Sequence, residues 1–160
     1  MIFVCTGTQI FQFDRLIKKI DELVENGTIT EEIFAQIGAG EYLPKNYKYE
    51  RYINKDLFLK YQEKANIVIS HGGTGALIGA SKLGKNIIAV PRLAMYNEHV
   101  DDHQIQVVQV LEREGYIRAV YEMDDLGHVI KEAMNKPITK RYKRESNIIH
   151  LIEQYIDSLK

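Results

Sequence analysis

Short apolar runs and amphipathic segments alternate along most of this 160-residue chain. Most of the runs are rich in β-branched side chains, which is typical of strands, and the run at 47–53 alternates charged with aromatic residues, as a half-exposed strand does. The predicted strands are residues 2–5, 33–37, 47–53, 67–70, 86–90 and 116–120.

The segments between these runs have apolar residues at helical spacing, as in the first one, where Phe11, Leu16, Ile17, Ile20, Leu23 and Val24 share one face. The predicted helices are residues 11–24, 55–64, 75–83, 101–114, 124–135 and 144–159. Strands that alternate with helices form a mostly parallel sheet with helices on both faces. The chain is therefore predicted to be a single Rossmann-like α/β domain spanning residues 1–160.

The amino-acid composition further narrows the class of protein. Hydrophobic residues make up 45% and charged residues 27% of the chain, which suits one ordinary core. The formal net charge of −1 gives no general attraction to nucleic acid, so any recognition of an anion must be local. No apolar stretch approaches the roughly 20 residues of a membrane span, and the start lacks the basic region of a signal peptide. A cytoplasmic protein is expected, with its single cysteine, Cys5, as a buried strand residue rather than a nucleophile.

Ligands of such sheets bind at the carboxyl ends of the strands, so the loops there are the places to look for chemistry. The fourth predicted strand is followed by His71, Gly72, Gly73, Thr74 and Gly75, and a helix begins at once. Glycines let the backbone approach a ligand closely, and a helix N-terminus attracts anions. This segment is predicted to hold a diphosphate. The alternative is a glycine turn that only lets the helix pack on the strand.

Two further loops at that edge are polar. Gly7, Thr8 and Gln9 follow the first strand and could present N–H groups to a phosphate, although a plain turn with a helix cap also fits. The loop after the fifth strand has more polar groups than a solvated helix start requires, namely Asn97, Glu98, His99, Asp101, Asp102, His103 and Gln104.

Taken together, these segments resemble a known family. The quoted motifs are Phe3-Val-Cys-Thr-Gly-Thr-Gln9, Phe13-Asp-Arg-Leu16, His71-Gly-Gly-Thr-Gly75, Ile88-Ala-Val-Pro91 and Asn97-Glu-His-Val-Asp-Asp-His-Gln104. In this order and spacing they resemble the C-terminal, donor-binding half of GT-B glycosyltransferases, of the family 28 C-terminal type. More narrowly, the chain looks like a split subfamily in which that half is a separate polypeptide. Its members include the catalytic subunit of the dolichol-linked N-acetylglucosaminyltransferase and bacterial counterparts in capsule and exopolysaccharide synthesis.

The resemblance implies roles for individual residues. Gly7 and Thr8, with Gln9, would approach the diphosphate or the acceptor, and the segment His71 to Gly75 would hold the diphosphate. The side that meets the sugar and ribose would be lined by Asn97, Glu98, His99, Asp102, His103 and Gln104. Many relatives have an acidic residue eight positions after the histidine, where this chain has Gly79. Ribose recognition would then move elsewhere, such as to Glu98.

The resemblance also implies a UDP-sugar substrate, a lipid-pyrophosphate-linked sugar acceptor and a membrane-anchored partner that supplies the acceptor-binding half. The chain would sit peripherally on the cytoplasmic face of the membrane through that partner. We expect transfer without a metal or another cofactor, because N–H groups and a helix N-terminus can stabilise the departing diphosphate. His99 or Asp102 could act as the general base, unless the partner supplies it.

Two other interpretations remain open from the residues alone. Gly73-x-Gly75-x-x-x-Gly79 matches the spacing of some dinucleotide loops, which would make the chain an NAD(P)- or nucleotide-binding regulator without turnover. His99 and His103 lie one helical turn apart beside Asp101 and Asp102, a spacing that could bind a metal.

The segment 135–160 has its own pattern. Its basic cluster consists of Lys136, Lys140, Arg141, Lys143 and Arg144. The predicted last helix has a broad apolar face made of Ile148, Ile149, Leu151, Ile152, Tyr155, Ile156 and Leu159. Packing on its own domain is the default interpretation, and docking to the partner or to an anionic membrane is the alternative.

Overall fold

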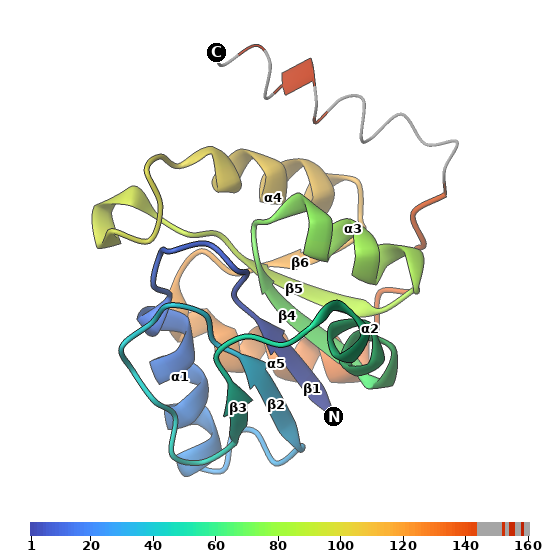
Figure 1. Ribbon diagram of the computed structural model, residues 1–160. Helices are drawn as coiled ribbons and strands as arrows, with labels where there is room; N and C mark the ends of the chain where they lie inside the picture. The colour runs from blue at the N-terminus through green and yellow to red at the C-terminus, as the bar shows by residue number, and fades with distance from the viewer. Residues whose placement is uncertain (144–151, 153, 156–157, 159–160) are drawn as a thin grey trace.

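A computed structural model describes residues 1–143, 152, 154, 155 and 158 of the chain. It contains a six-stranded, all-parallel sheet with the strand order β3-β2-β1-β4-β5-β6 (Figure 1). The strands are β1 (Ile2–Cys5), β2 (Ile33–Gln36), β3 (Lys48–Glu50), β4 (Ile67–His71), β5 (Asn86–Val90) and β6 (Arg118–Ala119). The predicted Rossmann-like parallel sheet is confirmed.

The helices cover the sheet on both faces (Figure 1). They are α1 (Asp14–Glu25), α2 (Lys55–Lys64), α3 (Thr74–Lys82), α4 (His103–Arg113) and α5 (Leu126–Asn135), with short 3-10 turns η1 (Ala94–Tyr96) and η2 (Met123–Asp125). One apolar layer joins the sheet to α1 and α5 through residues such as Ile17 and Ile130. The other joins it to α3 and α4 through residues such as Leu77 and Val108, with Phe58 of α2 packed against that layer.

Strand residues alternate between the two layers. Ile2 and Val4 belong to the layer under α1, whereas Phe3 and Cys5 belong to the layer under α3 and α4. Because both faces are buried, the strands have the nearly continuous apolar sequences that identify them in the chain. The Cys5 thiol donates to the Ser70 hydroxyl at 3.3 Å, and burial raises its pKa to about 11, which fits a structural residue.

Element ends differ from the predictions where tertiary contacts override local pattern. The first helix begins at Asp14, not at residue 11, because Arg92 binds the carbonyl oxygens of Phe11 and Gln12 at 2.9 Å. The edge strands are shorter than the predicted strands at 47–53 and 116–120. β3 pairs with β2 only over Lys48–Glu50, and β6 pairs with β5 only over Arg118–Ala119.

Part of the C-terminal segment packs on its own domain. The Tyr142 N–H donates to the Ser81 hydroxyl at 3.2 Å, and Ile152 is 3% exposed in the layer that includes α3 and α4. The predicted helix at 144–159 lies largely outside the described residues, so its docking role stays a prediction. Within the described part of the chain, no helix is both long and apolar enough to cross a bilayer.

The position of β1 and β4 determines where a ligand can bind. β1 pairs with β2 on one side and with β4 on the other. Strands β2 and β3 therefore extend the sheet on one side of β1, and β4, β5 and β6 extend it on the other. In open parallel sheets, ligands bind in the crevice outside the carboxyl ends of the strands at this switch point. Cys5 and Ser70 lie opposite each other, which places the loops that follow them side by side.

Candidate functional site

A pocket of about 280 Å³ lies at this switch point, and we call it the switch-point pocket. Its lining includes six residues that the sequence predicted as nucleotide-binding: Gly7, Thr8, Gln9, His71, Gly73 and Gly75. Ile53, Phe58 and Ala76 add an apolar wall, and Gln36 lies at the end of β2. The loops after β1 and β4, predicted separately from their sequences, therefore form opposite sides of one pocket.

The N-terminus of α3 opens beside this pocket. Its N-cap is Gly73, which has no side chain to cap the helix, and the first bond inside the helix runs from the Leu77 N–H to the Gly73 carbonyl at 3.2 Å. The N–H groups of the first turn, including those of Thr74 and Gly75, consequently have no partner inside the helix. Such N–H groups and the positive end of the helix dipole form an anion site.

His71 occupies the space between two glycines. A Cβ atom at Gly7, where φ is +84°, would lie 2.8 Å from Cε1 of the His71 ring, and a Cβ atom at Gly73 would overlap Nε2 of the same ring. Both positions therefore require glycine so that the imidazole can lie between the loops. Burial lowers the pKa of His71 to about 4, with a further contribution from the charge of Arg92. At neutral pH the ring is a neutral hydrogen-bonding group.

Gly72 and Gln104 form a structural link rather than an open wall. The Gln104 side-chain oxygen accepts from the Gly72 N–H and from the Arg92 N–H, each at 3.1 Å. Gln104 is 4% exposed, and a Cβ atom at Gly72 would lie 2.6 Å from its Cβ. This contact fixes the start of α4 against the ends of β4 and β5.

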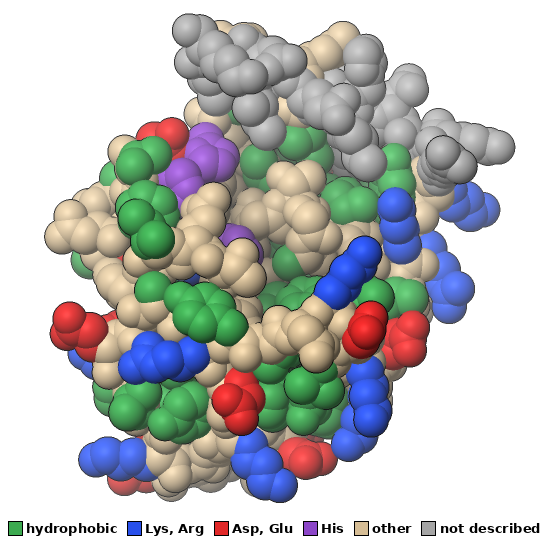
Figure 2. Space-filling model, viewed as in Figure 1, with side chains coloured by type: hydrophobic (Ala, Val, Ile, Leu, Met, Phe, Trp, Pro, Cys, Tyr) green, Lys and Arg blue, Asp and Glu red, His purple; other side chains and the backbone are tan. Residues whose placement is uncertain are grey.

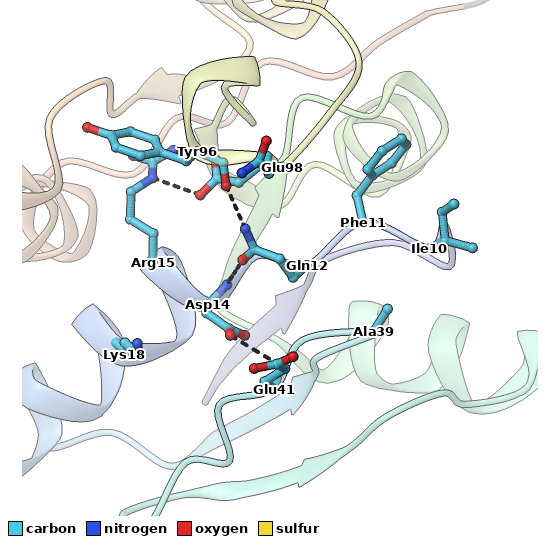
Figure 3. A pocket seen from close by; sticks show the side chains of 11 residues that line it. Ile10, Phe11, Gln12, Asp14, Arg15, Lys18, Ala39, Glu41, Tyr96 and Glu98 are labelled. Atoms are coloured by element: carbon cyan, nitrogen blue, oxygen red, sulfur yellow. Dashed lines mark hydrogen bonds and ion pairs between the residues drawn. The ribbon is translucent and has the colours of Figure 1, made fainter.

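A second, more open cavity of about 780 Å³ lies beside the first strand's loop, and we call it the outer pocket (Figure 3). Asn97 and Glu98 line it, together with Arg15 of α1 and Tyr96. Glu98 has no exposed side-chain area, and its two oxygens each accept from Arg15 at 2.9 Å. One of these oxygens also accepts from the Leu93 N–H at 3.0 Å. The Glu98 carboxylate thus holds the loop in place.

Arg92 is one of the residues that sequence reasoning did not single out. It is 2% exposed and donates to the carbonyl oxygens of Phe11, Gln12 and Glu98 at 2.9 to 3.0 Å, and to that of Thr6. Burial lowers its pKa to about 10, so it stays charged at neutral pH. One guanidinium therefore joins the loop after β1 to the loop after β5. Its only local signal is a single arginine directly after a buried strand and Pro91.

Gln36 has a similar supporting role in the switch-point pocket. It is 2% exposed, and its side-chain NH₂ group donates to the carbonyl oxygens of Gly7 at 2.8 Å and Arg51 at 2.9 Å. It holds Gly7 in the left-handed conformation opposite His71. A polar residue at the end of an apolar strand is the signal that could have identified it.

The remaining predicted residues lie in the loop before α4. The Asp102 carboxylate accepts from the Ala94 N–H at 2.8 Å, and the His99 ring packs on Phe11 with centroids 5.1 Å apart. His99 and His103 both contact Asp101. Asn97, with φ of 55°, turns the chain at the end of η1. The structure therefore places the predicted residues in two groups, one in the switch-point pocket and one along this loop.

The parallel sheet and the helices on its two faces have the fold of the C-terminal half of GT-B glycosyltransferases. MurG from Acinetobacter baumannii aligns with a TM-score of 0.62 and 16% identity over 96% of this chain and 49% of that one. A solution structure of ALG13 aligns with a TM-score of 0.58 over 91% of this chain and 90% of that one, also at 16% identity. At such identities these likenesses establish the fold.

Sequence comparison establishes the family. This chain belongs to the glycosyltransferase family 28 C-terminal domain family, whose model matches residues 1–157. The UDP-N-acetylglucosamine transferase subunit ALG13 of Homo sapiens is 29% identical over 130 residues, which cover 72% of this chain and 10% of that protein. The subunit of the same name from Yarrowia lipolytica is 30% identical over 66 residues, 41% of this chain and 32% of that protein. The chain therefore spans about a tenth of its human relative.

Proposed function

We propose that this chain is the donor-binding, catalytic subunit of a two-chain glycosyltransferase. It would move a hexose-type sugar from a UDP-sugar to a lipid-linked glycan acceptor during polysaccharide synthesis. The observation that supports this most strongly is the switch-point pocket, where His71 and the uncapped N-terminus of α3 face the loop after β1. Membership of a glycosyltransferase family supports the reaction class.

The chemistry follows from the leaving group. When the bond from the anomeric carbon to the β-phosphate breaks, its electron pair leaves with UDP, and negative charge grows on the diphosphate. The first-turn N–H groups of α3 and the helix dipole stabilise that charge, and the neutral His71 ring donates one further hydrogen bond. Because these groups already compensate the charge, departure of UDP requires no metal ion.

The general base that deprotonates the acceptor hydroxyl is assigned to the partner chain. The two candidates in this chain are each engaged elsewhere, since Asp102 accepts from Ala94 and His99 contacts Asp101. A base on the opposite wall of the cleft would face the sugar from the acceptor side, as the direction of attack requires. His99 and Asp102 remain the candidates if this chain proves active alone.

Exposed apolar side chains near the two pockets also support a partner chain. Three large apolar side chains near the two pockets are unusually exposed, Ile10 at 86%, Met95 at 76% and Val100 at 75%. Figure 2 shows hydrophobic side chains gathered near exposed histidine atoms on this face. A domain that closes the cleft would cover them. The chain aligns with 49% of MurG. We assign the acceptor-binding half to a membrane-anchored subunit that holds this chain at the cytoplasmic face.

The choice of UDP rests on the similarity of this chain to UDP-N-acetylglucosamine transferase subunits. Gly79 has no side chain to bind a ribose, and both oxygens of Glu98 are paired with Arg15. We therefore assign ribose binding to neither residue. Whether the sugar is a hexose or an N-acetylhexosamine is decided by the donors tested below.

The experiment is to purify the chain alone and together with a candidate membrane partner encoded beside it. UDP release is then measured for a panel of UDP-hexoses and UDP-N-acetylhexosamines with a lipid-pyrophosphate-sugar acceptor. The proposal expects turnover only when both chains are present, and loss of that turnover in the His71→Ala variant. Nucleotide binding without turnover for every donor and partner would instead favour the NAD(P)- or nucleotide-binding regulator.

A further inference from the structure

The loop before α4 brings three metal-ligand side chains together. Nδ1 of His99 lies 3.3 Å from Oδ1 of Asp101, and Nδ1 of His103 contacts the same oxygen. The ligand atoms of all three residues lie within 4.8 Å of one another. Elsewhere in the described part of the chain, no other group of three such residues comes this close.

The segment that holds these side chains is anchored at both ends. At its start, buried Glu98 binds Arg15 through its carboxylate and Arg92 through its carbonyl oxygen at 3.0 Å. At its end, buried Gln104 binds the loops after β4 and β5. The three ligand residues therefore lie on a short, fixed stretch of backbone.

The histidine rings are themselves oriented by packing. The His99 side chain is 8% exposed and its ring lies between Phe11 and His103, with centroids 5.1 and 4.7 Å away. The His103 N–H of the main chain donates to Asp101 at 3.1 Å, which orients the carboxylate towards both rings. Asp101 is 57% exposed, so solvent and ions reach the group.

Two imidazole nitrogens and one carboxylate oxygen are a donor set suited to Zn²⁺ and similar divalent transition metals. Metal bonds of about 2.0 to 2.2 Å in a tetrahedral site separate neighbouring ligand atoms by about 3.3 Å. Nδ1 of His99 and Oδ1 of Asp101 are separated by this distance. Nδ1 of His103 lies closer than this to the same oxygen, so the His103 ring has to move away from it to coordinate the same ion. Without a metal, the carboxylate oxygen is hydrogen-bonded to the His103 ring, and Nδ1 of His99 accepts from the Asp101 main-chain N–H at 3.4 Å.

We propose that His99, Asp101 and His103 form a binding site for a divalent transition metal ion, with one coordination position left open to solvent. The ion would fix the loop between β5 and α4 beside the outer pocket. The proposal rests on the geometry of these three side chains and does not depend on the proposed function.

The test uses the full chain, treated with a chelator and desalted. Zn²⁺ alone is titrated by calorimetry, and Co²⁺ alone is titrated by visible absorption, which reports tetrahedral coordination. We expect one ion per chain in the wild type, and affinity at least about tenfold lower in Asp101→Asn and His103→Ala. His128→Ala, which changes an exposed histidine on α5, should bind as the wild type does.

Circular dichroism and urea denaturation of each variant show whether it is folded, and Asp101→Asn changes an exposed side chain that the core does not need. Absence of Zn²⁺ binding by the folded wild type at millimolar concentration would overturn the proposal. Equal binding by the wild type and folded Asp101→Asn would also overturn it, because the carboxylate would then be no ligand.

Discussion

The His71 ring lies so close to Gly73 that a single methyl group at Gly73 would overlap Nε2 of the imidazole. The glycine loop is therefore shaped around this ring as well as around a ligand. Gly75, two residues further on, differs, because a Cβ atom there would meet nothing within 4 Å. The two glycines consequently make a matched pair for mutation.

Gly73→Ala is expected to displace the His71 ring and to lower the free energy of unfolding by about 1–3 kcal/mol, the usual cost of overpacking. Gly75→Ala should keep or slightly raise stability, because alanine favours the first turn of α3. Urea denaturation of both variants measures the difference. Equal stability of the two variants would contradict the packing around His71.

His71→Ala is expected to weaken UDP binding at least about tenfold, since a hydrogen bond to a charged group is worth about 1.5–3 kcal/mol. Calorimetry at neutral pH measures this, and His128→Ala on the exposed face of α5 is the control. Unchanged affinity in His71→Ala would show that the diphosphate binds outside the switch-point pocket.

Glu98→Ala separates a structural role from a ligand-binding one. Removing the buried carboxylate leaves the Leu93 N–H without its acceptor and Arg15 with only the Pro91 carbonyl oxygen, so the free energy of unfolding should fall by about 3–5 kcal/mol. Glu41→Ala, an exposed acid beside the same outer pocket, should change stability little. A Glu98→Ala protein with normal stability but weak UDP binding would instead identify Glu98 as a ribose ligand.

The pH dependence of the free energy of unfolding should reveal the lowered pKa of His71 in the folded chain. Its pKa falls from 6.5 in the unfolded chain to about 4 in the folded one, so the unfolded chain binds more protons between these values. The contribution of neutral His71 is therefore complete above pH 6.5 and is lost as the pH falls towards 4. The loss is no more than about 3 kcal/mol.

Urea denaturation of the wild type and His71→Asn across this range measures the effect. The difference in unfolding free energy between the two proteins should change steadily from pH 6.5 to 4 and stay level above pH 7. A constant difference throughout would mean that the folded-state pKa of His71 is not lowered.

Much of the fold could be predicted because burial on both faces leaves strands with distinctive sequences. The bounds of β1, β5 and α2 agree with the predictions, and for α2 the reason is local, since the Asn54 side chain caps the helix by accepting from the Leu57 N–H at 2.8 Å. The start of α1 could not be predicted in this way. Phe11 has helical spacing but packs on His99, which is remote in sequence.

The residues of the candidate site also fall into two kinds, those with a local sequence signal and those whose role arises only from the fold. Glycines and His71 of one loop reveal the switch-point pocket, because their chemistry is local to a strand end. Glu98 has the sequence of a ligand-binding acid, yet its partner Arg15 lies 83 residues away and only the fold brings them together. Arg92 has no motif at all, and its role arises from carbonyl groups that the loop after β1 presents.

The central place of β1 has a consequence for how the site forms during folding. β1 can pair with β2 about thirty residues later, but its other edge stays open until β4 arrives, since Ile2 pairs with Ile33 and with Ile67. Closing that long loop costs chain entropy before the pair is made, which slows parallel sheets generally. The two sides of the switch-point pocket therefore meet only once β4 has paired with β1. A chain stalled before it would expose an unpaired strand edge and no binding site.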